Sequence, residues 1–347
     1  MDLKPDFFNL ADYDYLLPQE LIAQEPLSAR DQSRLLVVDR ASQELREVKF
    51  SQVVDLFDPG DVLVLNDTKV IKARLQARRA SGAKVEVLLI KERQPEIWEA
   101  LVKPGKRALT GEKLVFGQGV EAQVVDKGEL GLRTLRFNQD IRPRLDFLGR
   151  APTPPYIKSE LDDPQKYQTV YAANDGAIAA PTAGFHFTSD LLRRIENKGV
   201  KTVYVTLHCG LGTFRPVTAP DIRQHQMAGE WVRVDQTAAE AVNTAKDRGQ
   251  RVIAVGTTCV RVLESAAVET PRGWRLSAYC QETGLYILPG YRFKVVDALL
   301  TNFHTPCSTN LVLVSVFCGL QRRQEIYRHA IKEKFRFFSF GDAMFIQ

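Results

Sequence analysis

TSDLLRRIENKGVKTVYVTL, residues 188–207, is the stretch of this sequence that decides the fold. Its first half has apolar residues at helical spacing, polar residues at 188–190 that can cap a helix, and Gly199 where a helix would end. Its second half, from Lys201 to Leu207, is the short apolar run of a strand. A helix that leads directly into a strand is one unit of an α/β fold.

Further strand patterns occur on both sides of residues 69–150, and helical and strand patterns alternate along the C-terminal half of the chain. The helical patterns are residues 189–199, 237–249, 258–267 and the first part of 320–341. The strand patterns are residues 34–39, 61–66, 201–207, 251–256 and 295–303. This alternation predicts an α/β fold in which helices pack on a mixed sheet.

Between Lys69 and Arg150 the sequence changes character. Short β-type segments such as KVEVLLI and VEAQVV, often alternating, are separated by glycine, proline and charged turns. This pattern predicts a small antiparallel β-barrel that is inserted into the α/β domain. The larger domain is then discontinuous: it comprises residues 1–68 and 151–347, and the insertion comprises residues 69–150.

The charge of the chain is concentrated in the insertion. The 347 residues carry a net charge of +5, which by itself says little about partners. The insertion has 18 Lys and Arg against 10 Asp and Glu, a net of +8, so the other residues sum to −3. Basic clusters are usually solvated surfaces, and only their shared location in one domain favours nucleic acid. The expected nucleic-acid contacts are Arg78, Arg79, Lys103, Lys106 and Arg107.

The sequence shows no pattern of a membrane span, a secretion signal or a disulfide framework, and this predicts the compartment of the protein. No apolar run reaches the roughly 18–20 residues of a membrane span. The acidic, aromatic start MDLKPDFFNLADYDY has neither the basic nor the apolar region of a secretion signal. The five cysteines are scattered and form no CxxC pair, which fits a reducing compartment. We therefore expect a cytoplasmic protein.

Four segments place polar and titratable residues at strand ends or in glycine-rich turns, where α/β folds build their sites. The first is APTAGFHFT, residues 180–188, which contains Thr182, Gly184 and His186. Gly184 can let the backbone approach a ligand closely. A turn with a helix cap and a core histidine explains the same residues, and for this segment alone it is the favoured interpretation.

The second segment is TLHCGLGTFRP, residues 206–216, followed by HQMAGE, residues 225–230. Its turn offers backbone N–H groups to an anion or a nucleotide, and Arg215 adds a guanidinium. The third glycine of a dinucleotide motif and the lysine of a P-loop are absent, so NAD and Walker-type ATP binding are unsupported. His225 and Glu230 are spaced wrongly for one helix face, which disfavours zinc, but in a loop or strand they could form an acid/base pair.

The third segment, GTTCVRVLE at residues 256–264, has the pattern of a turn that leads from a strand into a helix. The hydroxyl groups of Thr257 and Thr258 would point toward a ligand at the helix N-terminus. A capped helix with Arg261 and Glu264 as a surface pair explains the pattern equally well.

The fourth segment comprises LPGYRFK, residues 288–294, and TNFHTPCST, residues 301–309. It places Asn302 and His304 at the end of an apolar strand. A lone histidine in such a position is usually a structural hydrogen-bonding group.

In this order, the four segments resemble the S-adenosylmethionine:tRNA ribosyltransferase-isomerase family of queuosine biosynthesis. GDVLVLNDTKVI at 60–71, YQTVYA at 167–172 and FFSFGDAM at 337–344 carry the same resemblance, which spans nearly the whole chain. It implies a discontinuous α/β domain with an inserted β-barrel. It also implies that the ribosyl part of S-adenosylmethionine is transferred to 7-aminomethyl-7-deazaguanine at the wobble position of a tRNA. The products would be epoxyqueuosine in tRNA, adenine and methionine.

This chemistry suggests roles for individual residues. A base is needed to form a carbanion beside the sulfonium, and a proton donor assists the departure of adenine. We expect His225 with Glu230 as the acid/base pair, and His186 and His208 as further catalytic candidates. The expected substrate contacts are Asn66, Asp67, Thr68, Thr182, Gly184, Gly212, Thr213, Phe214, Arg215, Thr257, Thr258, Arg261, Tyr291, Asn302 and His304.

Further expectations concern the sulfonium and the partners. Phe214 and Tyr291 would lie beside the cationic sulfur, since aromatic faces attract cations. The expected partners are S-adenosylmethionine as co-substrate and a tRNA with a GUN-type anticodon. We expect no metal, no other cofactor, no membrane association and a monomeric enzyme.

The chain departs from the family pattern at Ala228, Gly284, Leu288 and Cys307. Ala228 stands where a second histidine is usual, and Cys307 stands where a basic residue is typical. Two alternatives therefore stay open: a tRNA-binding paralogue without catalysis, or a related transferase that acts on a free nucleoside.

Overall fold

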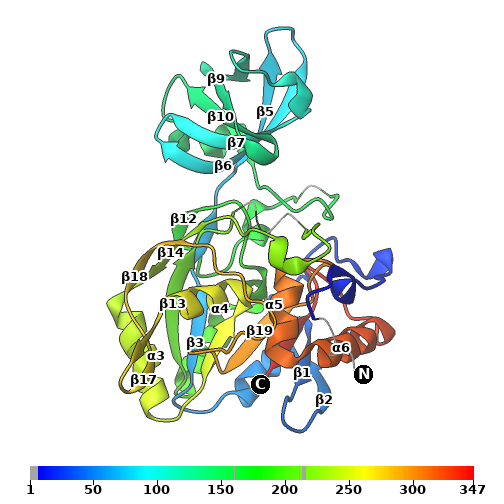
Figure 1. Cartoon of the computed structure of the whole chain (residues 1–347), viewed down its shortest axis with the longest axis vertical. Helices are drawn as coiled ribbons and strands as arrows, with labels where there is room; N and C mark the ends of the chain where they lie inside the picture. The colour runs from blue at the N-terminus through cyan, green and yellow to red at the C-terminus, as the bar shows by residue number, and fades with distance from the viewer. Residues whose placement is uncertain (1–6, 160, 211, 213–215) are drawn as a thin grey trace. The chain divides into compact units, whose positions relative to one another are not determined.

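The computed structural model of the chain describes residues 7–347 except 160, 211 and 213–215, and the side chains of 107 and 130 are outside this description. The chain forms two compact units (Figure 1). The larger comprises Met1–Thr68, Pro155–Asn174 and Ala180–Gln347, and the smaller comprises Lys69–Pro154 and Asp175–Ala179. The smaller unit thus runs past Arg150 and takes in 175–179, which we expected in the larger domain.

The larger unit is built on a nine-stranded mixed sheet. Its spatial order is β18 (Tyr279–Thr283), β14 (Glu230–Val234), β13 (Lys201–Leu207), β3 (Val62–Asn66), β15 (Val252–Val255), β19 (Ala298–Asn302), β20 (Ala343–Ile346), β1 (Arg34–Val38) and β2 (Leu45–Lys49). The central strands β13, β3, β15 and β19 are mutually parallel. β20 is antiparallel to β19 and parallel to β1. The expected mixed sheet is confirmed.

Helices cover this sheet. The α-helices of the unit are α2 (Ser189–Asn197), α3 (Gln236–Asp247), α4 (Gly256–Ser265), α5 (Thr309–Cys318) and α6 (Leu320–Lys332). Alternate residues of the strands, such as Leu63, Leu65 and Val255, join a buried core cluster with α2 and the 3-10 helix η4 (Phe50–Leu56). The intervening strand residues point to the opposite face, since side chains alternate along a strand. α3 and α4 contact β3, β13 and β15. None of the described helices is long and apolar enough to cross a membrane.

Short elements complete the larger unit. β16 (Ala267–Thr270) and β17 (Gly273–Leu276) form a hairpin. β4 (Thr68–Val70) pairs with β12 (Asn174–Ala177), and each of these two strands has one residue in the larger unit and the rest in the smaller unit. The 3-10 helices of the unit include η1 (Leu10–Tyr13), η2 (Gln19–Leu21), η3 (Arg30–Gln32), η8 (Pro164–Tyr167), η9 (Thr182–His186) and η11 (Ile222–Gln224).

The smaller unit is an antiparallel β-barrel (Figure 1). Its strands are, in spatial order, β11 (Gly149–Arg150), β5 (Arg74–Arg79), β6 (Lys84–Gln94), β7 (Ile97–Lys103), β10 (Leu132–Phe137), β9 (Val120–Lys127) and β8 (Lys113–Gly117). β5 also pairs with β8, and this pairing closes the barrel. The unit also contains η5 (Gly105–Arg107), η6 (Glu129–Gly131), η7 (Arg142–Arg144) and α1 (Leu145–Leu148). The expected β-barrel is confirmed.

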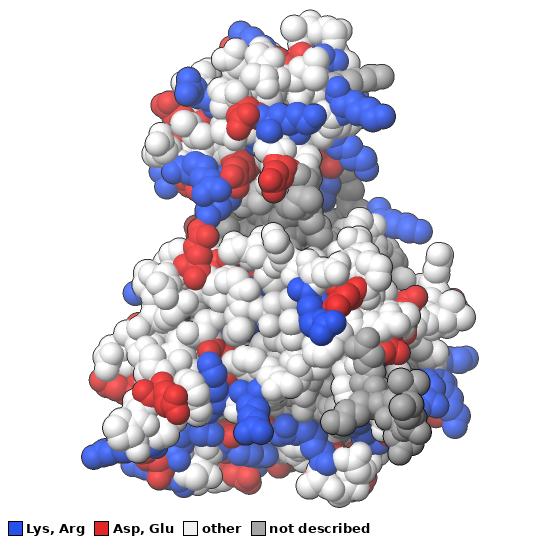
Figure 2. Space-filling model, in the orientation of Figure 1, with Lys and Arg blue, Asp and Glu red and all other residues white. Residues whose placement is uncertain are grey.

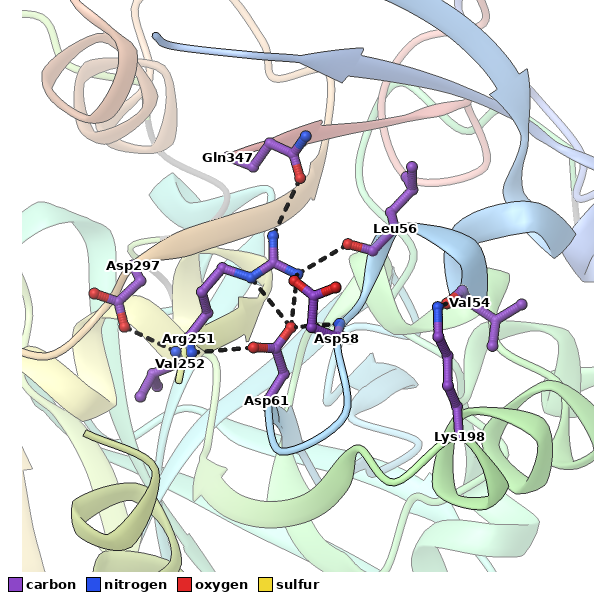
Figure 3. A network of polar contacts seen from close by, with 9 residues as sticks. All are labelled: Val54, Leu56, Asp58, Asp61, Lys198, Arg251, Val252, Asp297 and Gln347. Atoms are coloured by element: carbon purple, nitrogen blue, oxygen red, sulfur yellow. Dashed lines mark hydrogen bonds and ion pairs between the residues drawn. The ribbon is translucent and has the colours of Figure 1, made fainter. Parts of the chain in front are cut away.

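A polar network fixes the amino ends of the parallel strands (Figure 3). Arg251, just before β15, donates to the Oδ2 atom of Asp61, just before β3, from Nε at 3.1 Å and from Nη2 at 2.6 Å. Its Nη1 atom donates to Oε1 of Gln347, which follows β20, at 3.3 Å. Asp297, just before β19, accepts from the backbone N–H of Val252 at 2.8 Å. This edge of the sheet is therefore used for stability, which leaves the carboxyl edge for a site.

Candidate active site

The carboxyl ends of β3, β13, β15 and β19 lie at one edge of the sheet because these strands are parallel. The chain leaves β3 toward its neighbour β13, whereas α4 leads from β15 to β19 on the other side. The direction of the connections thus changes between β3 and β15. In open α/β sheets, ligands bind outside the carboxyl ends of the strands at such a point.

Asn66 ends β3 and joins it to β13. Its Nδ2 atom donates to the carbonyl of Leu207 at 3.1 Å, and its Oδ1 atom accepts from the N–H groups of Leu207 at 3.0 Å and Thr68 at 3.1 Å. The residue is fully buried. Its amide is therefore occupied by the backbone, so Asn66 holds the strand ends together beneath the site.

The next two residues, Asp67 and Thr68, form hydrogen bonds with residues at the end of β13. The Asp67 carboxylate accepts from the Thr206 hydroxyl at 2.7 Å and from the Asn174 amide at 2.8 Å. The hydroxyl of Thr68 and Nδ1 of His208 are 2.8 Å apart. The imidazole of His208 stacks on Trp231, with ring centroids 5.0 Å apart. The structure thus brings Asp67, Thr68 and His208 to the same edge, as predicted candidates for the site.

His186 lies in a buried chain of hydrogen bonds. Thr182 donates to Oδ1 of Asn302 at 2.8 Å, and the Asn302 amide nitrogen lies 3.2 Å from Nε2 of His186. Nδ1 of His186 lies 2.7 Å from the Ser33 hydroxyl. Burial, with smaller effects from Arg336 and Arg30, lowers the pKa of His186 to about 3. The ring is therefore neutral, and it links the end of β19 to the start of β1.

His304 has a similar structural environment. Its Nε2 atom lies 2.9 Å from the Thr301 hydroxyl, and its backbone N–H donates to the Tyr327 hydroxyl at 2.9 Å. Burial lowers the pKa of His304 to about 3. His304 is thus a neutral histidine whose main-chain and ring groups are engaged by neighbouring residues.

Glu230, at the start of β14, is paired with Arg261 of α4. The Nη1 atom of Arg261 donates to Oε2 of Glu230, and the Gly210 N–H donates to Oε1 at 2.7 Å. Arg261 is 7% exposed and Glu230 is 4% exposed. The surface pair of Arg261 with Glu264 is therefore wrong: Glu264 is also buried, at 2% exposure. Helical spacing could not reveal this, because the partner of Arg261 lies on a strand.

Glu264 instead holds the segment after β18. Its carboxylate accepts from the N–H groups of Lys294, Val295 and Val296 and from the hydroxyl of Tyr291 at 3.0 Å. Tyr291, expected beside the sulfonium, therefore has its hydroxyl engaged by a buried carboxylate, and the edge of its ring meets Phe293.

His225 follows η11 and is half-buried. Its ring meets Tyr286 edge to face, with centroids 5.5 Å apart. Among the described residues, no hydrogen bond or ion pair joins His225 to Glu230, whose carboxylate is occupied by Arg261 and Gly210. Burial alone lowers the pKa of His225. The imidazole is therefore neutral near pH 7 and able to accept a proton, but the expected pairing with Glu230 is wrong.

The start of α4 completes the edge. The Thr257 hydroxyl donates to Oδ1 of Asn310 at 3.0 Å. A Cβ atom on Gly256 would lie 3.5 Å from both Ala183 Cβ and the Thr258 hydroxyl, so η9 and the first turn of α4 are neighbours. Gly256 has a φ of +87°, which suits glycine at this turn from β15 into the helix.

Some expected site residues are not placed. Thr213, Phe214 and Arg215 lie outside the described residues, so their expected contacts are not tested. Gly212 is described, and a Cβ atom on it would meet nothing within 4 Å. Among the described residues, no group of three or more His, Cys, Asp or Glu side chains is placed to hold a metal ion.

A small, open pocket borders His186 in the larger unit. It is lined by Pro26, Leu27, Arg30, Ser33, Lys166, Phe185, His186, Ser339, Phe340 and Gly341. Apart from His186, no residue of this lining was expected in the site. These residues come from segments far apart in the chain, and of these segments 180–188 and FFSFGDAM at 337–344 carried part of the family resemblance.

The basic residues of the smaller unit differ in their partners. Figure 2 shows basic side chains over the drawn face of this unit, with acidic ones between them. Arg79 is paired with Glu112 at 2.9 Å, and Arg78 donates to the carbonyl of Gly82 at 3.0 Å. Lys103 and Lys106 are exposed. The side chain of Arg107 lies outside the described residues.

Fold and site together define an α/β enzyme with an inserted β-barrel. The model of one protein family, described as queuosine biosynthesis protein, matches residues 10–346. The chain belongs to this family.

Proteins with similar sequences align with almost the whole chain. A protein of Acetivibrio thermocellus named S-adenosylmethionine:tRNA ribosyltransferase-isomerase is 46% identical, covering 98% of this chain and 100% of its own. Proteins of the same name from Desulforamulus reducens and Clostridioides difficile are each 48% identical over 97% of this chain and 99% of their own. The crystal structure of an S-adenosylmethionine tRNA ribosyltransferase from Thermotoga maritima is 38% identical, with a TM-score of 0.56 and coverage of 97% of this chain and 100% of that one.

Proposed function

We propose that this chain is an S-adenosylmethionine-dependent tRNA ribosyltransferase-isomerase. It transfers the ribosyl part of S-adenosylmethionine to 7-aminomethyl-7-deazaguanine at the tRNA wobble position and rearranges it, which gives epoxyqueuosine, adenine and methionine. The observation that carries this proposal is the match, over almost the full chain, to relatives named for this reaction. None of these relatives favours the alternatives of a non-catalytic paralogue or a free-nucleoside transferase.

The geometry at the carboxyl edge supports the same reaction. A proton must be removed beside the sulfonium, and His225 is a half-buried imidazole whose lowered pKa keeps it neutral near pH 7. Asp67, Thr68 and Thr182 add polar groups at the ends of β3 and in η9. The proposal therefore assigns proton removal to His225 and substrate positioning to the strand ends.

The finer features belong to the same proposal. The tRNA carries a GUN-type anticodon, and the enzyme acts as a monomer. S-adenosylmethionine is a co-substrate, and the reaction requires no resident metal or redox cofactor, because it proceeds by proton transfers and by the departure of adenine and methionine.

The proposal is tested by incubating the protein with S-adenosylmethionine and tRNA that carries the precursor base. We expect adenine release, and mass spectrometry of the digested tRNA should show the epoxyqueuosine nucleoside. The same tRNA without the precursor base is the control and should give neither product. Binding of tRNA without adenine release would indicate the paralogue, and turnover of the free nucleoside would indicate the other alternative.

The basic barrel predicts a salt-dependent affinity for tRNA. Charge reversal of the exposed Lys103 and Lys106 should weaken binding and reduce the slope of log affinity against log salt by about 1 for each phosphate that is no longer neutralised. Arg79→Gln is the comparison variant, because Glu112 already offsets the charge of Arg79. Binding measured at several salt concentrations checks this. An unchanged slope in the lysine variants would show that the barrel does not contact tRNA.

A further inference from the structure

Among the described residues, the hydroxyl groups of Thr169, Tyr171 and Thr258 near the carboxyl edge are buried without a hydrogen-bond partner. Thr169 and Tyr171 belong to the YQTVYA segment and lie together. Most buried polar atoms in proteins are hydrogen-bonded, so an unpartnered one calls for an explanation. Neither residue was expected in the site from the sequence.

The two side chains lie together over Gly184 of η9. A Cβ atom on Gly184 would come within 2.1 Å of the Tyr171 hydroxyl oxygen and 2.7 Å of Cγ2 of Thr169. Only glycine therefore allows these side chains to occupy this position. The absence of a side chain at Gly184 makes room for the Tyr171 hydroxyl group and the Thr169 methyl group. Among the described residues, no acceptor meets either hydroxyl group.

The segment that carries them is attached to the end of β3. The backbone N–H groups of Ala173 and Asn174 donate to the carbonyl of Asp67 at 2.8 and 3.1 Å. The ring of Tyr171 packs on Tyr204 of β13, with centroids 5.8 Å apart. On the other side, Thr182 in the same η9 binds Asn302 at the end of β19. The two hydroxyl groups thus lie among the strand ends that form the candidate site.

The chemistry of the pair determines what it can bind. Burial raises the pKa of the Tyr171 phenol well above its ordinary value, so the group keeps its proton. The Thr169 hydroxyl also carries a proton. Both groups are donors that lack an acceptor, so their ligand must supply lone pairs. Because both oxygen atoms are shielded from solvent, that ligand must be small enough to reach them between the packed side chains.

We propose that the hydroxyl groups of Tyr171 and Thr169 donate hydrogen bonds to the adenosyl part of S-adenosylmethionine. The adenine ring nitrogens and ribose oxygens are acceptors of the required kind, and S-adenosylmethionine is much smaller than tRNA. This inference rests on the proposed function, since it takes its ligand from that reaction. It makes both residues substrate contacts that position the group from which adenine departs.

The test uses Tyr171→Phe and Thr169→Val, which remove the hydroxyl groups and keep the shapes of the side chains. We expect each variant to bind S-adenosylmethionine about five- to tenfold more weakly in calorimetry, as the loss of one hydrogen bond implies. The melting temperature without ligand should be unchanged or higher, because no hydrogen bond within the protein is removed. Tyr204→Phe is the control and should bind S-adenosylmethionine like the wild type, since Tyr204 is 39% exposed.

The outcomes separate this inference from the proposed function. If the wild-type protein turns over S-adenosylmethionine and both variants bind it as tightly, the inference alone is wrong. A lower melting temperature would show that the hydroxyl groups have a structural role, and weaker binding of tRNA alone would assign them to tRNA; either result overturns the inference. If the wild-type protein neither binds nor consumes S-adenosylmethionine, the proposed function itself fails.

Discussion

Replacement of His225 by alanine should reduce the rate of adenine release by at least about 100-fold, the usual effect of losing a general base. His225 is half-buried, and its lowered pKa leaves the ring neutral near pH 7. His186, in contrast, has both ring nitrogens close to neighbouring side chains. His225 is therefore a better-placed proton acceptor than His186.

The pH dependence gives a second readout for His225. Because burial lowers its pKa, the base form should persist below pH 6.5 and disappear only at lower pH. The wild-type rate should fall through that acidic range, and the residual activity of His225→Ala should lack this fall. His329→Ala, on α6, is the control and should keep wild-type turnover. Undiminished adenine release by His225→Ala would remove His225 from the mechanism.

The Glu230→Ala variant should lose about 3–5 kcal/mol of folding free energy. The substitution leaves the guanidinium of Arg261 buried without its carboxylate, and breaking such a pair from one side costs this amount. It also removes the acceptor that holds the Gly210 N–H. Denaturant unfolding of the wild type and the variant measures the loss directly.

Two further variants separate a structural role of Glu230 from a catalytic one. Arg261→Met combined with Glu230→Ala removes both charges and should recover much of the lost stability. Glu230→Gln keeps an oxygen for the Gly210 N–H and should be less destabilised than Glu230→Ala. If both Glu230 variants unfolded like the wild type but released no adenine, Glu230 would instead be the acid/base group first expected from the sequence.

The elements with strong local patterns were predictable. β13 spans Lys201–Leu207, the apolar run expected there. α2 lies within the predicted segment 189–199, and α3 begins one residue before the predicted segment 237–249. β20 and β14 were not predicted, because β20 begins inside the FFSFGDAM motif and β14 begins at the end of HQMAGE, so the sequence presents them as parts of motifs and not as separate strands. Their place in the sheet comes from tertiary pairing.

The candidate site was predictable only in part. Thr68 and His208 come just after recognisable strands, and Asn302 ends one. Because these strands are parallel, the three residues lie at the same edge of the sheet. The partner of Glu230 could not be found in the same way. Arg261 is 31 positions away in sequence, and only the packing of α4 against β14 brings the two charges together. Spacing within one segment pointed to His225 instead.

The place of β20 has a consequence for how the chain folds during synthesis. β20 lies between β19 and β1, so the hairpin of β1 and β2 has no sheet partner until residues 343–346 are available. The ribosome must therefore release almost the whole chain before its earliest strands can be incorporated. Until then, the apolar residues of β1 require protection from aggregation, which makes chaperones more important for this domain than for the barrel, whose strands all lie within 74–150.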